Sequence, residues 1–200
     1  LELIHVQYLP AGQYFLKYTI NMSLVRAMKQ KVPVILTFAE VHTKMSNIRE
    51  IVLQFLQKVL AGRAGAVITH APDQAAFLSK YNKHSHHVHM GLIPRPIKPR
   101  KDKNVLFFGM LGPGKGVEHL IKAMDELPEY NLRVAGSITH KPYEQVLKTA
   151  IEKSTNKKII ADFSWIVEET KNNYYDRSDI VVLPYVWSPS QSGVLHDALS

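Results

Sequence analysis

The chain has 200 residues, of which 46% are hydrophobic, enough material for one large domain or two modest ones. Cys is absent, which excludes disulfides and thiolate metal sites. No apolar run approaches the roughly 20 residues that span a bilayer, so we expect a soluble protein. The formal net charge of +8 indicates a basic surface or attraction to an anionic ligand, membrane face or nucleic acid, but no nucleic-acid motif is recognised.

The two ends of the sequence look cut. The chain starts directly in a strand pattern, LELIHVQYL, without an initiator Met or a signal-peptide pattern. It ends in an apolar helical pattern, VLHDALS, that has barely begun. We therefore expect a fragment of a longer protein. The absence of Cys favours a cytoplasmic location, with association at the inner membrane face as an extension of that expectation.

Strand and helix patterns alternate before Pro94. Apolar and β-branched runs predict strands over residues 3–9, 32–38, 66–70 and 87–93. Helical spacing of the apolar residues predicts helices over residues 13–29, 47–60 and 72–80, and the last of these has Pro at its start.

The helix expected after Asn47 has a clear apolar stripe, formed by Ile48, Ile51, Val52, Phe55, Leu56, Val59 and Leu60. Lys44, Arg49 and Lys58 accompany it. The pattern favours a helix that packs its stripe on the core and leaves a solvated basic face. A peripheral contact with a membrane surface is the alternative, because basic amphipathic helices also lie at lipid interfaces.

Residues 94–103, PRPIKPRKDK, contain three prolines and five cations and predict a linker rather than a core element. Alternation resumes after this segment. Strands are expected over residues 104–110, 132–136, 158–163 and 179–184, and helices over residues 116–128, 143–153 and 167–177.

Repeated strand–helix units with continuous apolar strands predict an α/β fold whose parallel sheets are covered by helices. Two such sets predict two Rossmann-like domains, residues 1–93 and residues 104–200, both of them incomplete and joined by the linker 94–103. In sheets of this kind, ligands bind at the carboxyl ends of the strands.

A glycine-rich loop at the end of the strand predicted over residues 104–110 is the clearest chemical signal. Gly109, Gly112, Gly114 and Gly116 surround Lys115, and an amphipathic helix follows. Glycines let backbone N–H groups approach an anion, while the helix start and the lysine add positive charge, so the loop predicts a phosphate site. The spacing also nearly matches a P-loop, but that motif needs Ser or Thr where Gly116 stands. A purely structural turn is the other alternative.

Several longer segments carry a family resemblance. They are VLFFGMLGPGKGVEHLIKAM, SDIVVLPYVWSPSQSGVLHDALS, VPVILTFAEVHTK, AGAVITHAPDQAAFL and HVHMGLIP. In that order they resemble the donor-phosphate segment, the donor-ribose segment, two parts of the acceptor domain and the interdomain crossover of retaining GT-B glycosyltransferases. This is the group 1 family that includes many mannosyl- and glucosyltransferases. The resemblance covers nearly the whole chain. It implies transfer of a hexose, with retention, from a UDP-, GDP- or ADP-sugar to a hydroxyl of a sugar or lipid-linked acceptor.

The resemblance also implies roles for particular residues. Lys115, flanked by Gly114 and Gly116, falls on the lysine that binds the donor diphosphate. Asp197 falls on the second acid of a paired-glutamate motif that holds the donor ribose. The remaining positions implied in donor binding are the loop glycines Gly109 and Gly112, the amides at Gly193 and Val194, and the base-contacting loop from Phe163 to Ile166. Trp165 and Trp187 are either packing or base-stacking residues. No cofactor or metal is required, and no Asp-x-Asp pair is present to hold one.

Three positions depart from the family pattern. Met110 stands where an arginine is usual, Pro189 where the first glutamate is expected, and Ala39 where an acceptor-domain histidine often lies. His42 could substitute for that histidine, with Glu40 as its acid–base partner, although loop polarity explains both residues almost as well. A catalytically weak or inactive homologue that binds a nucleotide sugar or a partner is therefore the alternative function, ahead of a P-loop nucleotidase.

The segment HSHHVH places four histidines, His84, His86, His87 and His89, in a short stretch. Histidines at strand alternation can share a face and bind a metal. No nearby Asp, Glu or Cys supplies a further ligand, so the pattern favours a partly exposed strand edge or loop. No nucleic-acid partner is expected.

Overall fold

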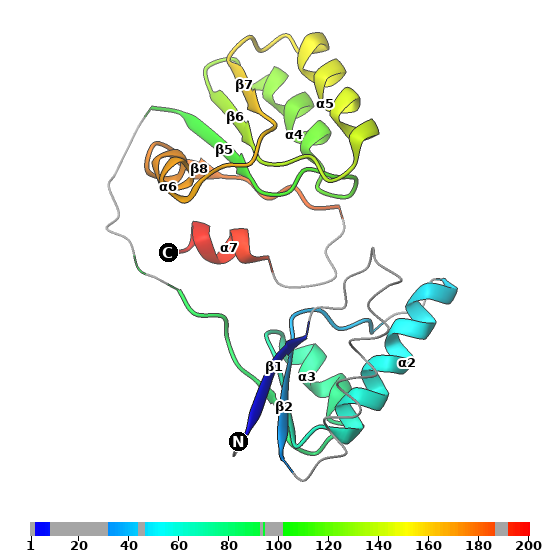
Figure 1. Ribbon diagram of the computed structural model, residues 1–200. Helices are drawn as coiled ribbons and strands as arrows, with labels where there is room; N and C mark the ends of the chain where they lie inside the picture. Colours follow the sequence, from blue (N-terminus) through cyan, green and yellow to red (C-terminus); the bar gives the residue numbers. More distant parts are fainter. Residues whose placement is uncertain (1–2, 9–31, 44–46, 93, 95–101, 187–191) are drawn as a thin grey trace. The chain divides into compact units, whose positions relative to one another are not determined.

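The computed structural model describes residues 3–8, 32–43, 47–92, 94, 102–186 and 192–200. They divide into two compact units, with Gly91 in the first and Leu92 in the second (Figure 1). The helix expected over residues 13–29, most of the linker 94–103, Lys44, Trp187 and Pro189 lie outside the described residues. Within the described part of the chain, no helix has the length and apolar character needed to cross a membrane.

The first unit contains a parallel sheet whose described strands lie in the order β1-β2-β3-β4. These strands are β1 (Ile4–Tyr8), β2 (Val34–Phe38), β3 (Ala66–Thr69) and β4 (Ser85–His87). Helix α2 (Ile48–Arg63) connects β2 to β3, and helix α3 (Pro72–Leu78) connects β3 to β4. The register pairs Ile4 with Val34, Ile35 with Ala66, and Val67 with Ser85.

The core of this unit lies between the sheet and its two described helices. Because side chains alternate along a strand, Val34, Leu36 and Phe38 all point to one face of β2. There they pack with Leu60 of α2 and Leu78 of α3. The continuous apolar pattern of residues 32–38 therefore predicted a buried strand correctly.

The strand expected over residues 87–93 is wrong in position. The observed strand, β4, covers Ser85–His87, and the residues from Val88 to Leu92 are not strand. The reason is the length of its neighbour, because β3 ends at Thr69. The Val88 amide donates to the Thr69 carbonyl over 2.9 Å, and beyond this bond β4 has no strand to pair with.

The apolar stripe of α2 does not pack on the core as the sequence pattern favoured. Leu60 is buried as expected, but Ile48, Ile51, Val52 and Phe55 are exposed. The face toward the core instead carries two buried glutamines, Gln54 and Gln57, with Leu60, Ala61 and Ala64 further along. The glutamines turn inward because they bond to the backbone that follows β2, as described below.

The second unit contains a parallel sheet whose described strands lie in the order β7-β6-β5-β8. They are β5 (Asn104–Phe108), β6 (Asn131–Ala135), β7 (Ile159–Asp162) and β8 (Ile180–Val181). The helices are α4 (Val117–Ala123), α5 (Lys141–Lys153), α6 (Glu168–Asp176) and α7 (Gly193–Ala198), and α4 continues into a 3₁₀ turn, η2 (Met124–Glu126).

Helices cover both faces of this sheet. Val105 and Phe107 of β5 pack with Leu120 of α4 and Leu147 of α5 on one face. On the opposite face the ring of Phe108 lies 5.7 Å from the ring of Tyr175 in α6. Figure 1 shows α4 and α5 side by side, away from α6. The predicted α/β fold with parallel sheets is thus confirmed.

One buried side chain ties the end of the α4–η2 segment to the start of β7. The Asn156 Nδ2 atom lies within hydrogen-bond distance of the carbonyl oxygens of Met124 (3.1 Å), Leu127 (3.2 Å) and Tyr130 (3.2 Å). Its Oδ1 accepts from the Lys158 amide over 2.8 Å. With a side chain this buried, no water can take over these bonds.

We therefore expect Asn156→Ala to lower the free energy of unfolding by about 2 kcal/mol, because buried carbonyl and amide groups lose their partner. Urea denaturation followed by circular dichroism measures the change. Asn173→Ala, at an exposed position of α6, is the matched control and should change stability by less than about 0.5 kcal/mol. Equal effects of the two substitutions would contradict the assignment.

Candidate functional site

The glycine-rich loop begins at the carboxyl end of β5 and is bonded to the segment that follows β6. The Gly109 amide donates to the Ala135 carbonyl over 3.0 Å, and the Leu111 amide donates to the Ser137 carbonyl over 2.9 Å. The Thr139 amide returns a bond to the Leu111 carbonyl over 2.9 Å. These bonds extend the β5–β6 pairing beyond the sheet and fix where the loop starts.

The second half of the loop lies directly against the segment that follows β8. The Val186 amide donates to the Gly114 carbonyl over 2.9 Å. Gly116 has φ +69°, and a Cβ added there would lie 2.0 Å from the Pro184 carbonyl oxygen. Only glycine can occupy this position without moving one of the two segments. The approach joins two stretches of chain far apart in sequence.

Lys115 is held within this contact rather than extended into solvent. Its amide donates to the Gly112 carbonyl over 3.2 Å, and its Nζ lies 4.0 Å from the centroid of the Tyr185 ring. Burial lowers the pKa of Lys115 below its ordinary value of 10.5. The ring face attracts the ammonium group and keeps it at the edge of the loop. The predicted phosphate-binding cation therefore has a defined position.

Helix α7 is joined to the same constellation. The Tyr185 hydroxyl and Ser192 Oγ share a hydrogen bond of 3.0 Å, and Ser192 caps the start of α7. A Cβ on Gly109 would lie 3.1 Å from Cγ2 of Val194. The structure thus brings Gly109, Lys115 and Val194 into one region at the carboxyl end of the sheet, with Gly193 beside Val194 at the first turn of the helix.

Asp197 lies on α7 and forms an ion pair that the sequence did not indicate. Its Oδ2 is 3.4 Å from Nζ of Lys171, which is also 2.9 Å from Glu168 Oε1. Burial alone would lower the pKa of Lys171, but the bonds and charges of Glu168 and Asp197 outweigh it and raise that pKa. The Asp197 carboxylate is about one-third exposed and so can still meet a ligand.

The loop after β7, predicted to contact the nucleotide base, has one strongly exposed aromatic side chain. Asp162 Oδ1 accepts from the Ser164 amide (3.2 Å) and hydroxyl (2.6 Å), which shapes the turn. Trp165 follows and is 82% exposed, so it is not a packing residue. The Phe163 side chain packs against the core, and Ile166 is half-buried. Of these side chains, Trp165 is the best placed to meet a planar ligand.

Met110, at the position where the family resemblance expects arginine, is 65% exposed. Its side chain therefore fills no hole in the core. The loop keeps its anchoring bonds at Gly109 and Leu111 on either side of it. The exchange removes a cation from the loop without a packing role that explains the methionine.

In the first unit, Glu40 and His42 follow β2 and lie together. His42 Nε2 is 3.6 Å from Glu40 Oε1, close enough for an ion pair when the imidazole is protonated. This Nε2 is buried without a hydrogen-bond partner among the described residues. The two side chains named as tentative acid–base partners are thus adjacent, and their roles stay predictions.

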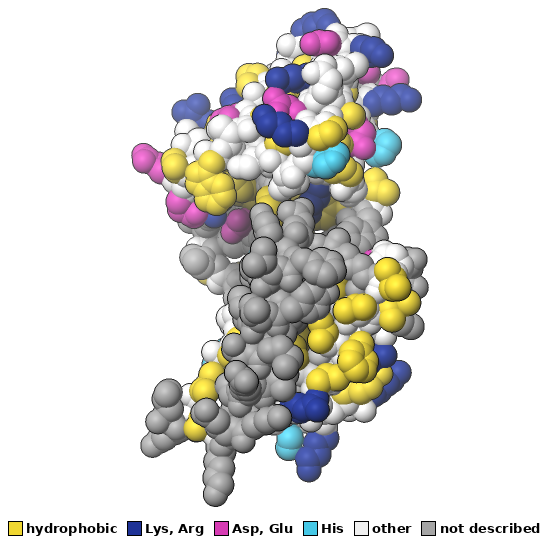
Figure 2. Space-filling model, turned by 45° about the vertical axis from the view of Figure 1, so that its right-hand side comes forward, with side chains coloured by type: hydrophobic (Ala, Val, Ile, Leu, Met, Phe, Trp, Pro, Cys, Tyr) yellow, Lys and Arg dark blue, Asp and Glu magenta, His cyan; other side chains and the backbone are white. Residues whose placement is uncertain are grey.

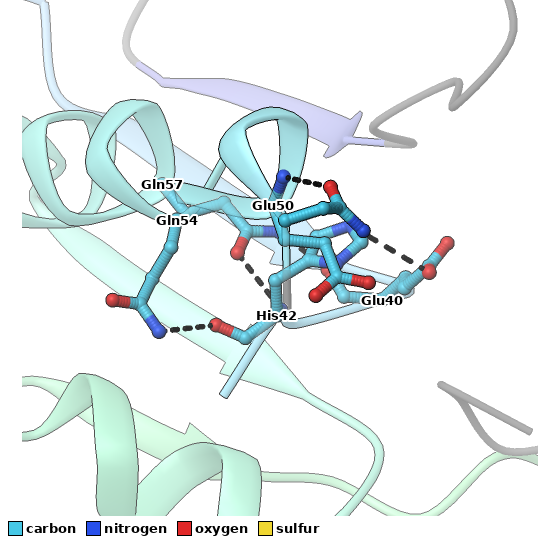
Figure 3. A network of polar contacts seen from close by, with 6 residues as sticks. Glu40, His42, Glu50, Gln54 and Gln57 are labelled. Atoms are coloured by element: carbon cyan, nitrogen blue, oxygen red, sulfur yellow. Dashed lines mark hydrogen bonds and ion pairs between the residues drawn. The ribbon is translucent and has the colours of Figure 1, made fainter. Parts of the chain in front are cut away.

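Two glutamines of α2 hold the backbone of this pair, as Figure 3 shows. Gln57 donates from Nε2 to the Glu40 carbonyl over 2.8 Å and accepts at Oε1 from the His42 amide over 3.0 Å. Gln54 donates from Nε2 to the His42 carbonyl over 3.0 Å. Neither glutamine was predicted from the sequence to belong to this site. Their signal was a pair of polar residues three apart inside an apolar helix.

The histidines of HSHHVH lie just before, on and just after β4, the edge strand of the described sheet. The rings of His87 and His89 contact each other edge to face, with centroids 4.4 Å apart. His70 Nδ1 bonds to the Val88 carbonyl over 2.9 Å. Within the described ranges, no three His, Asp or Glu side chains group as metal ligands. The arrangement matches the partly exposed strand edge that the sequence favoured.

Comparison with known proteins places the second unit in a sequence family. The family described as "Glycosyl transferases group 1" matches residues 92–191, which include the glycine-rich loop, Lys115, and the Phe163 to Ile166 loop. No curated protein matches the chain.

Solved structures show the same fold. The chain is similar to Anabaena Alr3699/HepE, crystallised with UDP and glucose, with a TM-score of 0.74 and 13% identity over 99% of this chain and 56% of that one. The catalytic domain of Starch Synthase IV from Arabidopsis thaliana, bound to ADP and acarbose, has a TM-score of 0.64 and 11% identity over 98% of this chain and 54% of that one. An α,α-trehalose-phosphate synthase (UDP-forming) from Burkholderia vietnamiensis has a TM-score of 0.65 and 10% identity over 86% of this chain and 52% of that one.

The chain therefore spans a little more than half the length of each of these proteins. At such low identities the likeness concerns the fold, which is that of the GT-B glycosyltransferases.

The contact between Gly116 and Pro184 gives a direct test of the loop. We expect Gly116→Ala to lower the free energy of unfolding by at least about 2 kcal/mol, because a Cβ meets the Pro184 carbonyl and the backbone has a positive φ. Gly62→Ala in α2 is the control, since its Cβ would lie at an ordinary 3.5 Å from the nearest atom. Thermal unfolding that shows both variants at wild-type stability would exclude the tight approach.

Proposed function

The chain belongs to the glycosyl transferases group 1 family, and we propose that the protein transfers a glycosyl group from a nucleotide sugar to a hydroxyl acceptor. The observation that carries this proposal is the position of Lys115. This lysine is held by the Gly112 carbonyl and the Tyr185 ring in a glycine-rich loop at the carboxyl end of a parallel sheet. That edge is where such sheets bind ligands.

The chemistry follows from the charge that develops on the leaving group. When the bond between the sugar and the diphosphate breaks, negative charge grows on the diphosphate oxygens. The Lys115 ammonium group and the N–H groups of the glycine-rich loop would stabilise that charge, because they are positioned before the reaction begins. The positions of these donor groups matter more than how many there are, because a donor that is already in place needs no reorganisation as the charge appears.

Asp197 would accept hydrogen bonds from the ribose hydroxyls of the donor. Its carboxylate is already oriented by Lys171 through one oxygen, at 3.4 Å. An ionised carboxylate accepts hydrogen bonds through both of its oxygens. The carboxylate, Val194 and the glycine-rich loop all belong to the second unit.

We extend the proposal to a hexose as the transferred group and to retention of configuration at its anomeric carbon. The likeness of the donor-phosphate and donor-ribose segments to the retaining enzymes supports both. The donor would be a UDP-, ADP- or GDP-hexose, and solved relatives crystallised with UDP or ADP favour the first two. The acceptor would be a hydroxyl of a sugar or of a lipid-linked sugar.

A weak or inactive homologue that only binds nucleotide sugar is the second candidate. The observation that favours it is Met110, whose exposed side chain leaves Lys115 without the second cation usual in the loop. Donor binding and sugar transfer separate the two candidates. Binding without release of nucleoside diphosphate, measured on the full-length protein with UDP-, ADP- and GDP-sugars, would favour the inactive homologue.

Lys115→Gln is expected to weaken binding of the nucleoside diphosphate roughly 10- to 100-fold, because a charge-assisted hydrogen bond to phosphate is lost. Isothermal titration calorimetry with UDP, ADP and GDP measures the change. Lys122→Gln, at an exposed position of α4, is the matched control and should keep wild-type affinity.

The pH dependence gives an independent readout of the same residue. Only the protonated lysine attracts the diphosphate, and burial lowers the pKa of free Lys115. Wild-type affinity should therefore fall as the pH rises through that lowered pKa, while Lys115→Gln should lack this fall. Unchanged affinity in the variant at neutral pH would refute the assigned role.

Trp165→Ala is expected to weaken binding of the preferred nucleoside diphosphate about tenfold, because stacking on the base is lost. Binding of inorganic pyrophosphate, which has no base, should stay the same in this variant. Trp165→Phe keeps an aromatic face and should retain most of the affinity. A Trp165→Ala variant with wild-type affinity for the nucleotide would show that the exposed ring does not contact the base.

A further inference from the structure

Helix α2 exposes an apolar face that the proposed transfer activity does not use. Ile48 (80% exposed), Ile51 (49%), Val52 (38%) and Phe55 (63%) follow helical spacing. At 3.6 residues per turn they lie within an arc of about 100° on one side of the helix. We call these four side chains the α2 apolar face. Other exposed apolar side chains of the described chain lie on other segments, for example Leu3, Tyr81 and Val88 in the first unit and Val146 and Ile160 in the second.

This face is turned outward for a structural reason. The opposite side of α2 is fixed by the bonds of Gln54 and Gln57 to the backbone of Glu40 and His42. Both glutamines are buried, together with Leu60 further along the helix. Since these contacts set the rotation of the helix about its axis, the α2 apolar face cannot turn toward the core of the unit.

Positive charge borders the α2 apolar face. At 100° per residue, Lys58 and Arg63 lie on opposite sides of the exposed arc, whereas Glu50, the single acid in the sequence of α2, lies on the other side of the helix. The Lys58 ammonium is also 5.4 Å from the ring centroid of Tyr81, which is itself partly exposed. Figure 2 shows hydrophobic side chains gathered on this side of the first unit, with Lys and Arg side chains beside them.

The charge of the whole unit has the same sign. Residues 1–91 contain ten Lys and Arg against four Asp and Glu, so this part of the sequence holds six of the eight excess positive charges of the chain. An apolar face with Lys58 and Arg63 on its two sides is complementary to a layer that is apolar inside and anionic outside. A protein partner would need an apolar patch ringed by acids to match it equally well.

We propose that the α2 apolar face binds the surface of an anionic lipid bilayer. Helix α2 would lie in the plane of the interface, with Ile48, Ile51 and Phe55 among the acyl chains and Lys58 and Arg63 at the headgroup phosphates. Amphipathic helices with this distribution bind through buried apolar area and electrostatic attraction together. The contact would use residues of the first unit, whereas the residues proposed above to bind the donor belong to the second unit.

Flotation of the full-length protein with lipid vesicles tests this proposal. The wild type should bind vesicles of phosphatidylcholine and phosphatidylglycerol, and bind vesicles of phosphatidylcholine alone much more weakly. Ile51→Ser/Phe55→Ser should reduce binding to the anionic vesicles at least about tenfold, because the apolar contact is lost. Val146→Ser/Ile160→Ser, exposed apolar positions of the second unit, should bind like the wild type.

Lys58→Gln/Arg63→Gln should also reduce binding to anionic vesicles. Added salt should weaken vesicle binding by the wild type more than it weakens vesicle binding by this variant. Circular dichroism and affinity for the nucleoside diphosphate should be unchanged in Ile51→Ser/Phe55→Ser. The measurement of nucleoside diphosphate affinity separates a failure of the membrane contact from a failure of the proposed transfer function.

Three results would overturn the proposal. The first is wild-type binding to anionic vesicles by Ile51→Ser/Phe55→Ser, and the second is no vesicle binding by the wild type. The third is a wild-type dimer in analytical ultracentrifugation that Ile51→Ser/Phe55→Ser converts to a monomer, because the α2 apolar face would then bind a second copy of the chain.

Discussion

The second unit depends on one close approach, between the glycine-rich loop and the segment after β8. A Cβ added to Gly116 would lie 2.0 Å from the Pro184 carbonyl oxygen, so this position has no room for a side chain. This approach also places Tyr185 under the Lys115 ammonium group. Through the bond from Tyr185 to Ser192, it sets the start of α7 as well. A single steric constraint thus positions the cation and the helix that carries Asp197.

Lys115 and Asp197, the two charged residues proposed to bind the donor, each lie against a defined neighbour. Lys115 lies against an aromatic ring, while Asp197 shares Lys171 with Glu168. These two arrangements have opposite effects on lysine pKa, because burial lowers that of Lys115 and the two acids raise that of Lys171. Among the described residues, no carboxylate forms an ion pair with Lys115, which suits this lysine to an anionic ligand. Lys171 is paired with two acids, which suits it to orienting the Asp197 carboxylate.

The first unit resolves a conflict between two demands on α2. Its apolar residues outnumber the positions that face the core, and its two inward glutamines satisfy backbone groups that would otherwise be buried without partners. Satisfying those groups orders the loop that carries Glu40 and His42. The same rotation exposes Ile48 and Phe55. The same hydrogen bonds therefore order the loop that follows β2 and expose the α2 apolar face.

The sequence alone determined the alternation of strands and helices, the parallel α/β fold and the glycine-rich loop, because apolar periodicity and glycine spacing are local properties. It placed Lys115 in that loop but could not supply Tyr185, which contacts the lysine from 70 positions further along the sequence. It missed Lys171 for the same reason, since the partner, Asp197, lies on another helix. It also misjudged which side of α2 faces the core, and placed β4 too late. Both depended on tertiary pairing: hydrogen bonds from glutamines to a distant loop in one case, and the length of the neighbouring strand in the other. Only the folded structure decides such long-range contacts, because a local pattern records the hydrophobicity of a residue and not the partner it meets.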